Sequence, residues 1–139
     1  MLFLGPPGVG KSDLVLRLIH EGWWLVGDDQ LRLLPEAEGG GGLRAEAPEA
    51  LRGLLEVRGL GIFSGLPVAE PPPRLRLVVH LAADRAAVPR LPEPGLWSGA
   101  GATLPAVTLH AFDASATAKV GLALDAATGH ARQRAGAFA

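Results

Sequence analysis

The sequence predicts an α/β fold with a mixed sheet and few helices. Its clearest unit is local: an apolar run over residues 1–4, a glycine-rich loop over residues 5–12 and an amphipathic segment over residues 13–21. Later apolar runs, of which residues 75–81 form the strongest, are typical of buried strands. Strands that alternate with helices indicate the α/β class, although this chain has fewer crossover helices than a doubly wound sheet of its length usually has.

The first half of the chain is expected to contain a helix, a second strand and a hairpin. Apolar residues at helical spacing over residues 13–21 predict a helix that ends at Gly22. The run at residues 23–27 is predicted to be a buried strand, and the hairpin arms are expected at residues 31–34 and 43–47. Four consecutive glycines at the hairpin tip are entropically costly to order. The tip is therefore expected to be a plain flexible turn, the alternative being a loop that moves on binding.

The second half of the chain is expected to complete the sheet and to end with a helix. The expected elements are, in chain order, a short helical turn at residues 48–52, a strand that leads into a tight loop at 54–63, a central strand at 75–81, a mainly irregular segment at 82–104, a strand at 107–112, a helix at 114–127 with Asp113 or Ser115 as its N-cap, and a frayed tail at 132–139. The order of the strands in the sheet does not follow from the sequence.

The composition indicates one globular domain over residues 1–139. The hydrophobic fraction is 48%, which argues for a globular fold and against a disordered chain. The net charge is −1, from 13 basic and 14 acidic residues, and no block of like charge indicates nucleic acid or a membrane surface as a partner. Cysteine is absent, and the sequence shows neither a signal peptide nor an apolar stretch of ~18 residues. We therefore expect a soluble cytoplasmic protein with no nucleic-acid or membrane partner.

The glycine-rich loop matches the phosphate-binding pattern G-x-x-x-x-G-K-[ST]. Its residues are Gly5, Pro6, Pro7, Gly8, Val9, Gly10, Lys11 and Ser12. In this pattern backbone N–H groups surround phosphate oxygens, the lysine reaches the β- and γ-phosphates, and the hydroxyl ligates Mg²⁺. The alternative is a structural loop in a chain with 19 Gly and 12 Pro, but the flanking strand and helix favour a nucleotide site. The sequence therefore predicts binding of a nucleoside triphosphate.

Carboxylates that follow the loop are candidates for the chemistry. Asp28 and Asp29 come after a predicted strand, at the sheet edge where ligands bind in α/β proteins. One of the two carboxylates can hold Mg²⁺ and the other can accept a proton. The alternative is that the two aspartates form a plain turn. Glu56 precedes a glycine-containing segment, where either a functional role or an ion pair with Arg58 fits. Asp84, after the central strand, is a rival metal-binding carboxylate. Loop and carboxylates together indicate phosphoryl transfer to a hydroxyl.

Three segments together resemble the C-terminal catalytic domain of HPr kinase/phosphorylase. They are residues 5–14, residues 25–29 and residues 55–62, and Glu-Val-Arg-Gly-Leu-Gly-Ile at 56–62 is the most specific part. The resemblance runs from residue 1 to about residue 125, and the compact form looks like the short variants of some proteobacteria that lack the N-terminal domain. It implies a P-loop nucleotide-binding domain of the HPr kinase and phosphoenolpyruvate carboxykinase-like type.

The resemblance also implies an activity and the residues that perform it. The implied activity is that of an ATP-dependent serine kinase acting on HPr, the phosphocarrier of the sugar phosphotransferase system, in the regulation of carbohydrate metabolism. Asp29 matches the family's proton acceptor, Lys11 its phosphate-contacting lysine, and Arg90 a catalytic arginine. Ser12 and Glu56 match its Mg²⁺ ligands. Members of the family are often hexamers, and their reverse reaction, phosphorolysis, returns the phosphoryl group to inorganic phosphate.

Two features of the family pattern have no counterpart in this sequence. The family has a histidine upstream of the phosphate loop, whereas this sequence begins at Met1, so either the start is truncated or that role is missing. The family's P-x-R-P-G-R stretch, which serves dephosphorylation, has no equivalent at residues 109–115, so phosphorolysis is left open. A catalytically weak ATP-binding regulatory module and a small-molecule kinase on the same scaffold are therefore kept as alternatives.

Overall fold

The computed structural model describes residues 1–36 and 41–139, which form two compact units. The first unit comprises Met1–Lys11, Leu75–Gly99 and Thr103–Ala139, and the second comprises Ser12–Arg74 and Ala100–Ala102. The single domain expected over the whole chain stays a prediction. The expected flexible tip of the hairpin falls largely on residues 37–40, which lie outside the described residues.

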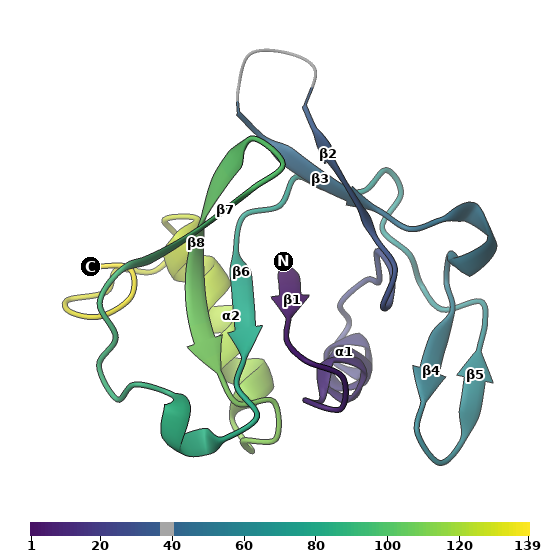
Figure 1. Ribbon diagram of the computed structural model, residues 1–139, viewed down its shortest axis with the longest axis horizontal. Helices are drawn as coiled ribbons and strands as arrows, with labels where there is room; N and C mark the ends of the chain where they lie inside the picture. Colours follow the sequence, from purple (N-terminus) through teal and green to yellow (C-terminus); the bar gives the residue numbers. More distant parts are fainter. Residues whose placement is uncertain (37–40) are drawn as a thin grey trace. The chain divides into compact units, whose positions relative to one another are not determined.

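A four-stranded sheet forms the centre of the first unit (Figure 1). The strand order is β1-β6-β8-β7, with β1 at Leu2–Leu4, β6 at Val78–Leu81, β7 at Gly95–Gly99 and β8 at Ala102–Leu109. β1 pairs parallel with β6, and β6 pairs parallel with β8, so these three strands end at the same edge. β7 is joined to β8 by the two residues Ala100 and Gly101, whose φ values of 47° and 78° are typical of a tight hairpin turn. The predicted mixed sheet is confirmed.

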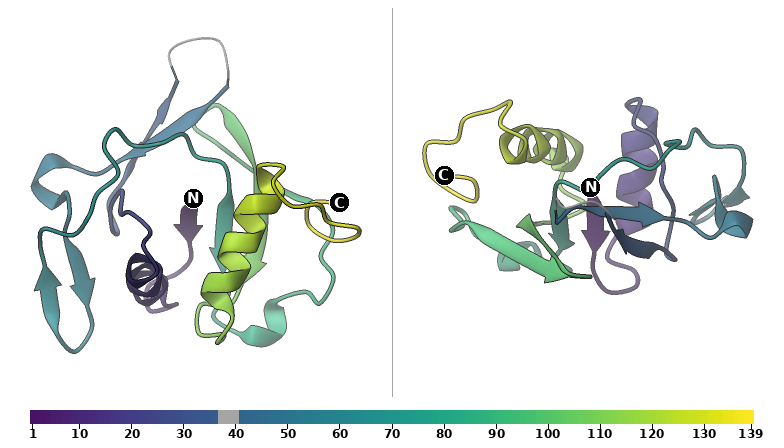
Figure 2. Two further views of the ribbon diagram at one scale, coloured as in Figure 1. Left: turned by 180° about the vertical axis from the view of Figure 1, so that it is seen from behind. Right: turned by 90° about the horizontal axis from the view of Figure 1, so that it is seen from above.

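Burial explains the interior position of β6. Val78 and Val79 point to opposite sides of the strand and are both fully buried, as expected of a parallel strand that is covered on both faces. Each such side chain stabilises the fold by about 1.5–3 kcal/mol relative to an exposed position. Helix α2 (Ala116–Ala127) covers one face of the sheet (Figures 1 and 2). The helix predicted at residues 114–127 is confirmed, and its N-cap position is Ser115, one of the two candidates.

The second unit consists mainly of a helix and two hairpins. Helix α1 spans Lys11–His20, β2 and β3 span Arg32–Pro35 and Leu43–Glu46, the 3₁₀ turn η1 spans Glu49–Leu51, and β4 and β5 span Leu55–Val57 and Gly61–Phe63. Both hairpins are antiparallel, with Leu33 opposite Ala45 in the first and Glu56 opposite Ile62 in the second. The predicted hairpin arms and the predicted helical turn are confirmed.

Helix α1 ends where the sequence predicts. Gly22 has a φ of 93°, a conformation that glycine adopts at little cost. The Trp23 N–H donates to the Leu18 carbonyl at 3.1 Å, and the Gly22 N–H donates to the Ile19 carbonyl at 2.9 Å. This pair of hydrogen bonds is the Schellman motif, which satisfies carbonyl groups that the helix itself leaves without a partner.

One of the expected elements is wrong and another is incomplete. Residues 23–27 form no strand, because only Leu25 makes a bridge, to Val68, while Trp24 is 65% exposed. Residues 82–104 are mainly irregular as expected, but the prediction is incomplete, because β7 and the start of β8 lie among them. Strand β8 continues through the proline at position 105, which strands tolerate where the ladder does not require the missing N–H.

The chain beyond α2 forms turns. Ala137 is buried, and the Phe138 N–H donates to the Gln133 side chain at 2.6 Å. The fraying expected for residues 132–139 stays a prediction. No helix in the described ranges is both long enough and apolar enough to cross a membrane.

Candidate active site

The glycine-rich loop joins β1 to α1, and its glycines are needed for different reasons. Gly8 and Gly10 have φ values of 80° and 102°, in the region that favours glycine. A Cβ at Gly8 would meet no atom within 4 Å, so only its conformation is special. A Cβ at Gly10 would lie 2.8 Å from Phe112 Cζ, and one at Gly5 would lie 3.0 Å from the Leu81 carbonyl oxygen. The loop is therefore held closely against the residues at the ends of β6 and β8.

Lys11 is hydrogen-bonded to the same loop. Its Nζ donates to the carbonyl oxygens of Gly5 at 2.7 Å and Pro6 at 3.2 Å. The Val9 N–H also donates to the Pro6 carbonyl, at 3.3 Å, which closes a turn within the loop. Hydrogen bonds between an ammonium group and an anionic oxygen are about twice as strong as neutral ones. Lys11 can therefore exchange these two carbonyls for phosphate oxygens.

In the second unit, Ser12 is paired with Asp28. The Ser12 hydroxyl donates to Asp28 Oδ1 at 3.0 Å, and both residues are half-buried. Asp28 Oδ2 accepts a long hydrogen bond of 3.5 Å from the backbone N–H of Glu56. This small network connects the first turn of α1, the segment before β2 and strand β4. It was not predicted as a contact, although each of its residues was a candidate.

The oxygen atoms of this network suit Mg²⁺. Mg²⁺ prefers hard oxygen ligands and in nucleotide sites usually takes one or two carboxylates, together with substrate phosphates and water. Ser12, Asp28 and Glu56 offer hydroxyl and carboxylate oxygens only. Glu56 is exposed, and among the ion pairs of the described residues none joins it to Arg58, so the structural alternative for this glutamate is wrong. The Glu56 carboxylate is thus available to a ligand.

Asp29 has an unusual backbone conformation. Its φ is 38°, in the left-handed region that side-chain-bearing residues rarely adopt, although aspartate tolerates it better than most. The Gln30 N–H donates to the Asp28 carbonyl and closes this turn. The strand expected before the pair is absent, so the prediction that the aspartates follow a strand end is wrong. A tight turn presents them instead, and backbone outliers of this kind cluster at functional positions.

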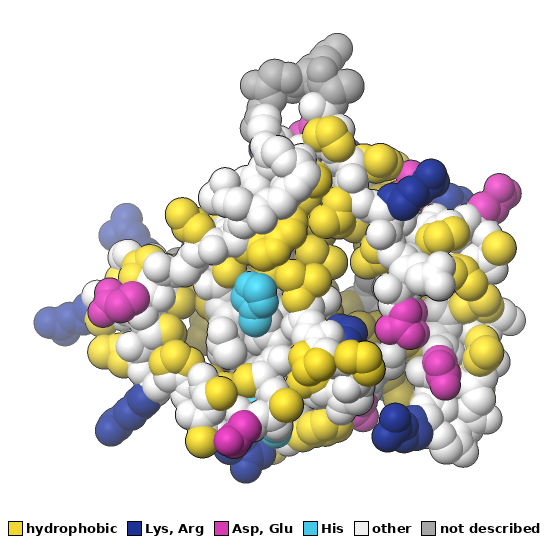
Figure 3. All heavy atoms as spheres, in the orientation of Figure 1, with side chains coloured by type: hydrophobic (Ala, Val, Ile, Leu, Met, Phe, Trp, Pro, Cys, Tyr) yellow, Lys and Arg dark blue, Asp and Glu magenta, His cyan; other side chains and the backbone are white. Residues whose placement is uncertain are grey.

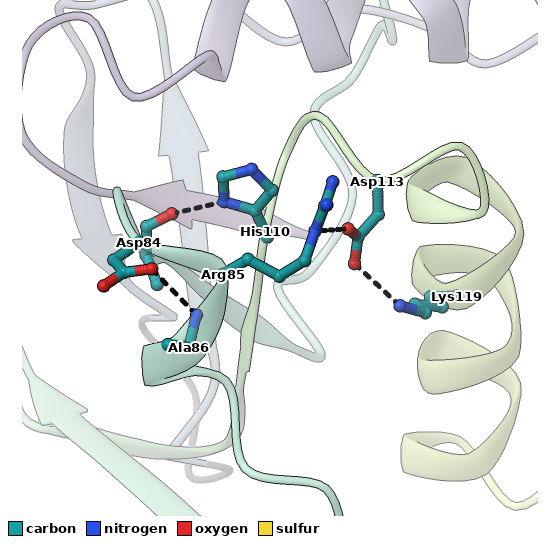
Figure 4. Close-up of polar contacts among 7 residues, drawn as sticks. Asp84, Arg85, Ala86, His110, Asp113 and Lys119 are labelled. Carbon is teal, nitrogen blue, oxygen red and sulfur yellow. Dashed lines mark hydrogen bonds and ion pairs between the residues drawn. The ribbon is translucent and has the colours of Figure 1, made fainter.

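Two other candidates lie in the first unit. The Asp84 carboxylate accepts a hydrogen bond from the Ala86 N–H at 2.9 Å and so caps the 3₁₀ turn η2 (Arg85–Ala87) (Figure 4). That structural role accounts for its position after the central strand. Arg90 is exposed in the segment between η2 and β7. The structure does not test its catalytic role, which stays a prediction.

A charged cluster at the ends of β6 and β8 was missed by the sequence analysis. Arg85 Nε donates to Asp113 Oδ1 at 2.5 Å, and Lys119 Nζ donates to Asp113 Oδ2 at 2.9 Å (Figure 4). The hydrogen bond from Lys119, aided by Arg85 and opposed by desolvation, holds the pKa of Asp113 below its ordinary value. His110 Nδ1 lies 3.0 Å from the Ala82 carbonyl oxygen, so a protonated Nδ1 connects the two loops. The sequence marked Asp113 only as a possible helix cap.

Known proteins resemble this chain in sequence and in fold. A family model for the HPr Serine kinase C-terminal domain matches residues 1–91. The HPr kinase/phosphorylases of Bordetella pertussis and Caldicellulosiruptor bescii are 41% and 38% identical over 86 residues, which cover 58% of this chain and 27% of each relative. The match thus spans about a quarter of the length of these curated relatives. The Hpr(Ser) kinase/phosphatase structure from Coxiella burnetii has a TM-score of 0.72 at 23% identity, over 86% of this chain and 81% of that one, which shows the same fold.

Proposed function

The chain belongs to the HPr serine kinase C-terminal domain family, and on this premise we propose that it is an ATP-dependent protein serine kinase. The observation that carries the proposal concerns one residue, Ser12. Ser12 completes the phosphate-binding motif, and its hydroxyl donates to the Asp28 carboxylate at 3.0 Å. The same residue therefore belongs to the phosphate-binding sequence and to the carboxylate network that phosphoryl transfer requires.

The loop would hold the phosphates of ATP. Its backbone N–H groups surround phosphate oxygens, which the conformations of Gly8 and Gly10 allow, and Lys11 Nζ binds the β- and γ-phosphates. Ser12, Asp28 and Glu56 would hold Mg²⁺, which, when bound, neutralises phosphate charge. The Lys11 charge stabilises the negative charge that develops on the transferred phosphoryl group.

Asp29 would act as the general base. The acceptor serine hydroxyl attacks the γ-phosphorus, the bond from that phosphorus to the bridging oxygen breaks, and ADP leaves. The hydroxyl proton passes to an Asp29 carboxylate oxygen. Asp29 is exposed, so the side chain of another protein can reach it. Arg90 is assigned as an additional cation for the transferred group.

The acceptor that we propose is a serine of HPr, the phosphocarrier of the sugar phosphotransferase system. The name HPr kinase/phosphorylase, which the curated relatives carry, supports this choice. We propose that the protein acts in the cytoplasm as a homo-oligomer, a hexamer by family resemblance, and that it regulates carbohydrate metabolism. The forward reaction is proposed as the main one, because the family's P-x-R-P-G-R stretch has no equivalent here.

Asp29→Asn tests this assignment by separating nucleotide binding from transfer. The variant is expected to bind MgATP nearly as well as the wild type in calorimetric titrations, because the loop and the Mg²⁺ ligands are unchanged. Phosphoryl transfer to purified HPr is expected to fall by about 10²–10⁴-fold, the usual contribution of a general base. Asp125→Asn, at an exposed aspartate on α2, is the matched control and should change neither quantity.

Other outcomes would assign another function. A parallel loss of MgATP binding in Asp29→Asn would contradict the role of a general base. Saturable ATP binding by the wild type without transfer to any acceptor would favour the regulatory module. Transfer to free hydroxyl compounds but not to HPr would favour a small-molecule kinase.

A further inference from the structure

We propose that the nucleobase of ATP stacks on Phe112, in the loop that follows β8; this inference rests on the proposed nucleotide site. Hydrophobic side chains reach the surface in several places (Figure 3), and Phe112 is 55% exposed. It differs from other exposed apolar side chains, such as Leu96 on β7, in that its ring edge contacts the phosphate loop. A Cβ at Gly10 would lie 2.8 Å from Phe112 Cζ and 3.0 Å from Cε2.

The sheet topology places Phe112 where a nucleotide would extend. Strands β1, β6 and β8 are parallel, so the segments that follow them leave the sheet at one edge, which is where ligands bind in α/β folds. The phosphate loop follows β1, and Gly5 lies against Leu81 at the end of β6. Gly10 lies against Ala111 and Phe112, beyond the end of β8. Within the first unit, the segments after β6 and β8 are therefore the immediate neighbours of phosphates bound in the loop.

The residues on both sides of Phe112 are anchored. His110 contacts Phe112 edge-on, with ring centroids 6.0 Å apart at 69°, and is tied to the Ala82 carbonyl through Nδ1. Asp113, the next residue, is held by Arg85 and Lys119 (Figure 4). Fixed neighbours on both sides limit the movement of the Phe112 backbone, so the point from which the ring projects is set before a ligand arrives. Less backbone entropy is then lost when a base binds.

The chemistry of this surface suits a nucleobase. Aromatic side chains stack on any base, because every base has a π-face. The Arg85 guanidinium, on a side chain that is 67% exposed, is bonded to the residue after Phe112 and adds a planar cationic group of the kind that also stacks on bases. The aromatic ring and the guanidinium thus suit the base of a nucleotide, and the neighbouring phosphate loop suits its phosphates.

Two ligands and three substitutions of Phe112 test the proposal on the full chain. MgATP contains a base, whereas magnesium tripolyphosphate offers only the phosphates. Phe112→Ala is expected to weaken MgATP binding by roughly 5- to 150-fold in calorimetric titrations and to leave tripolyphosphate binding unchanged. Phe112→Leu keeps an apolar side chain beside Gly10 and should show the same selective loss, while Phe112→Trp should retain affinity. Leu96→Ala, at a side chain that is 74% exposed, is the control and should change neither affinity.

The remaining outcomes would overturn the proposal. If Phe112→Leu weakened the binding of MgATP and of tripolyphosphate equally, Phe112 would shape the phosphate loop and would not bind the base. Unchanged MgATP affinity in Phe112→Ala would exclude stacking. A wild-type protein that binds tripolyphosphate and ATP equally well would also contradict a base subsite while leaving the phosphate site intact. Failure to bind either ligand would overturn the proposed nucleotide site itself, and the subsite with it.

Discussion

Gly10→Ala is expected to lower the free energy of unfolding more than Gly8→Ala does. Two costs add at Gly10. Its φ of 102° is a conformation that alanine rarely adopts, which costs about 1–3 kcal/mol. The new methyl would also lie 2.8 Å from Phe112 Cζ and 2.9 Å from Ala111 Cβ. An alanine Cβ moves only with its backbone, and Ala111 is fully buried, so this contact is hard to relieve. Overpacking of this kind costs about 1–3 kcal/mol, giving a combined destabilisation of about 2–6 kcal/mol.

Two other glycines isolate the conformational part of this cost. Gly8 and Gly129 have φ values of 80° and 82°, and a Cβ at either would meet no atom within 4 Å. Alanine at these positions is therefore expected to lower the free energy of unfolding by only about 1–2 kcal/mol. Gly129 follows α2 and lies outside the phosphate loop, so Gly129→Ala should also leave MgATP binding unchanged.

Urea unfolding of the three variants measures these costs, and titration with MgATP reports on the loop. The free energy of unfolding is expected to fall most for Gly10→Ala and by similar, smaller amounts for Gly8→Ala and Gly129→Ala. Gly10→Ala should also weaken MgATP binding, since relief of the contact with Ala111 requires the loop backbone to shift. Equal destabilisation by Gly10→Ala and Gly8→Ala would refute the reasoning, because the two positions differ in the contacts that a methyl group would make.

Two further predictions concern the polar side chains of Ser12 and Asp113. Ser12→Ala is expected to weaken ATP binding in the presence of Mg²⁺ more than in EDTA, because the proposed metal ligand is lost while the loop backbone remains; equal losses in calorimetry would contradict the ligand role. Asp113→Asn is expected to lower the melting temperature at neutral pH, because Lys119 and Arg85 stabilise the ionised carboxylate and hold its pKa below the ordinary 3.8. That stabilisation is present above pH 3.8 and is lost as the pH falls through the depressed pKa, so the difference in melting temperature from the wild type should shrink in acid. A difference that persists where Asp113 is protonated would argue against the ion pairs as its cause.

The parts of the fold that could be predicted have local signals. The strand, loop and helix of residues 1–20 are contiguous, and Gly22 provides the left-handed residue that ends α1. The β2–β3 hairpin and helix α2 are likewise formed by neighbouring segments whose hydrophobic patterns are complete in themselves. Such elements depend little on what they pack against, so their patterns could be interpreted correctly.

The elements that were predicted wrongly depend on distant partners. The apolar run at residues 23–27 looks like a strand, but whether a short apolar run pairs is decided by the chain beside it, and only Leu25 has a bridge. Strand β7 begins and ends with glycine, and its side chains alternate between half-buried and exposed, so its composition suggested a loop. Its pairing with β8 depends on the tight turn at Ala100 and Gly101, where an alanine has a positive φ that its type does not suggest.

The residues of the candidate site likewise divide into those with a local sequence signal and those without one. The phosphate loop is one contiguous segment, so its members could be assigned from the motif. The Ser12–Asp28 hydrogen bond joins residues 16 positions apart, and the Arg85–Asp113 bond joins residues 28 positions apart. Contacts over such separations are set by tertiary packing, which a single sequence does not encode as a visible pattern. Phe112 was missed for this reason, since nothing near it in sequence indicates that it lies against Gly10.

Transfer of labelled γ-phosphate from MgATP to purified HPr tests the central claim most directly. The wild-type chain is expected to label HPr on a serine, identified by mass spectrometry of the labelled protein, and Lys11→Ala is expected to abolish the label because the lysine that binds the β- and γ-phosphates is lost. A wild-type protein that binds MgATP but leaves HPr unlabelled would contradict the proposed kinase activity.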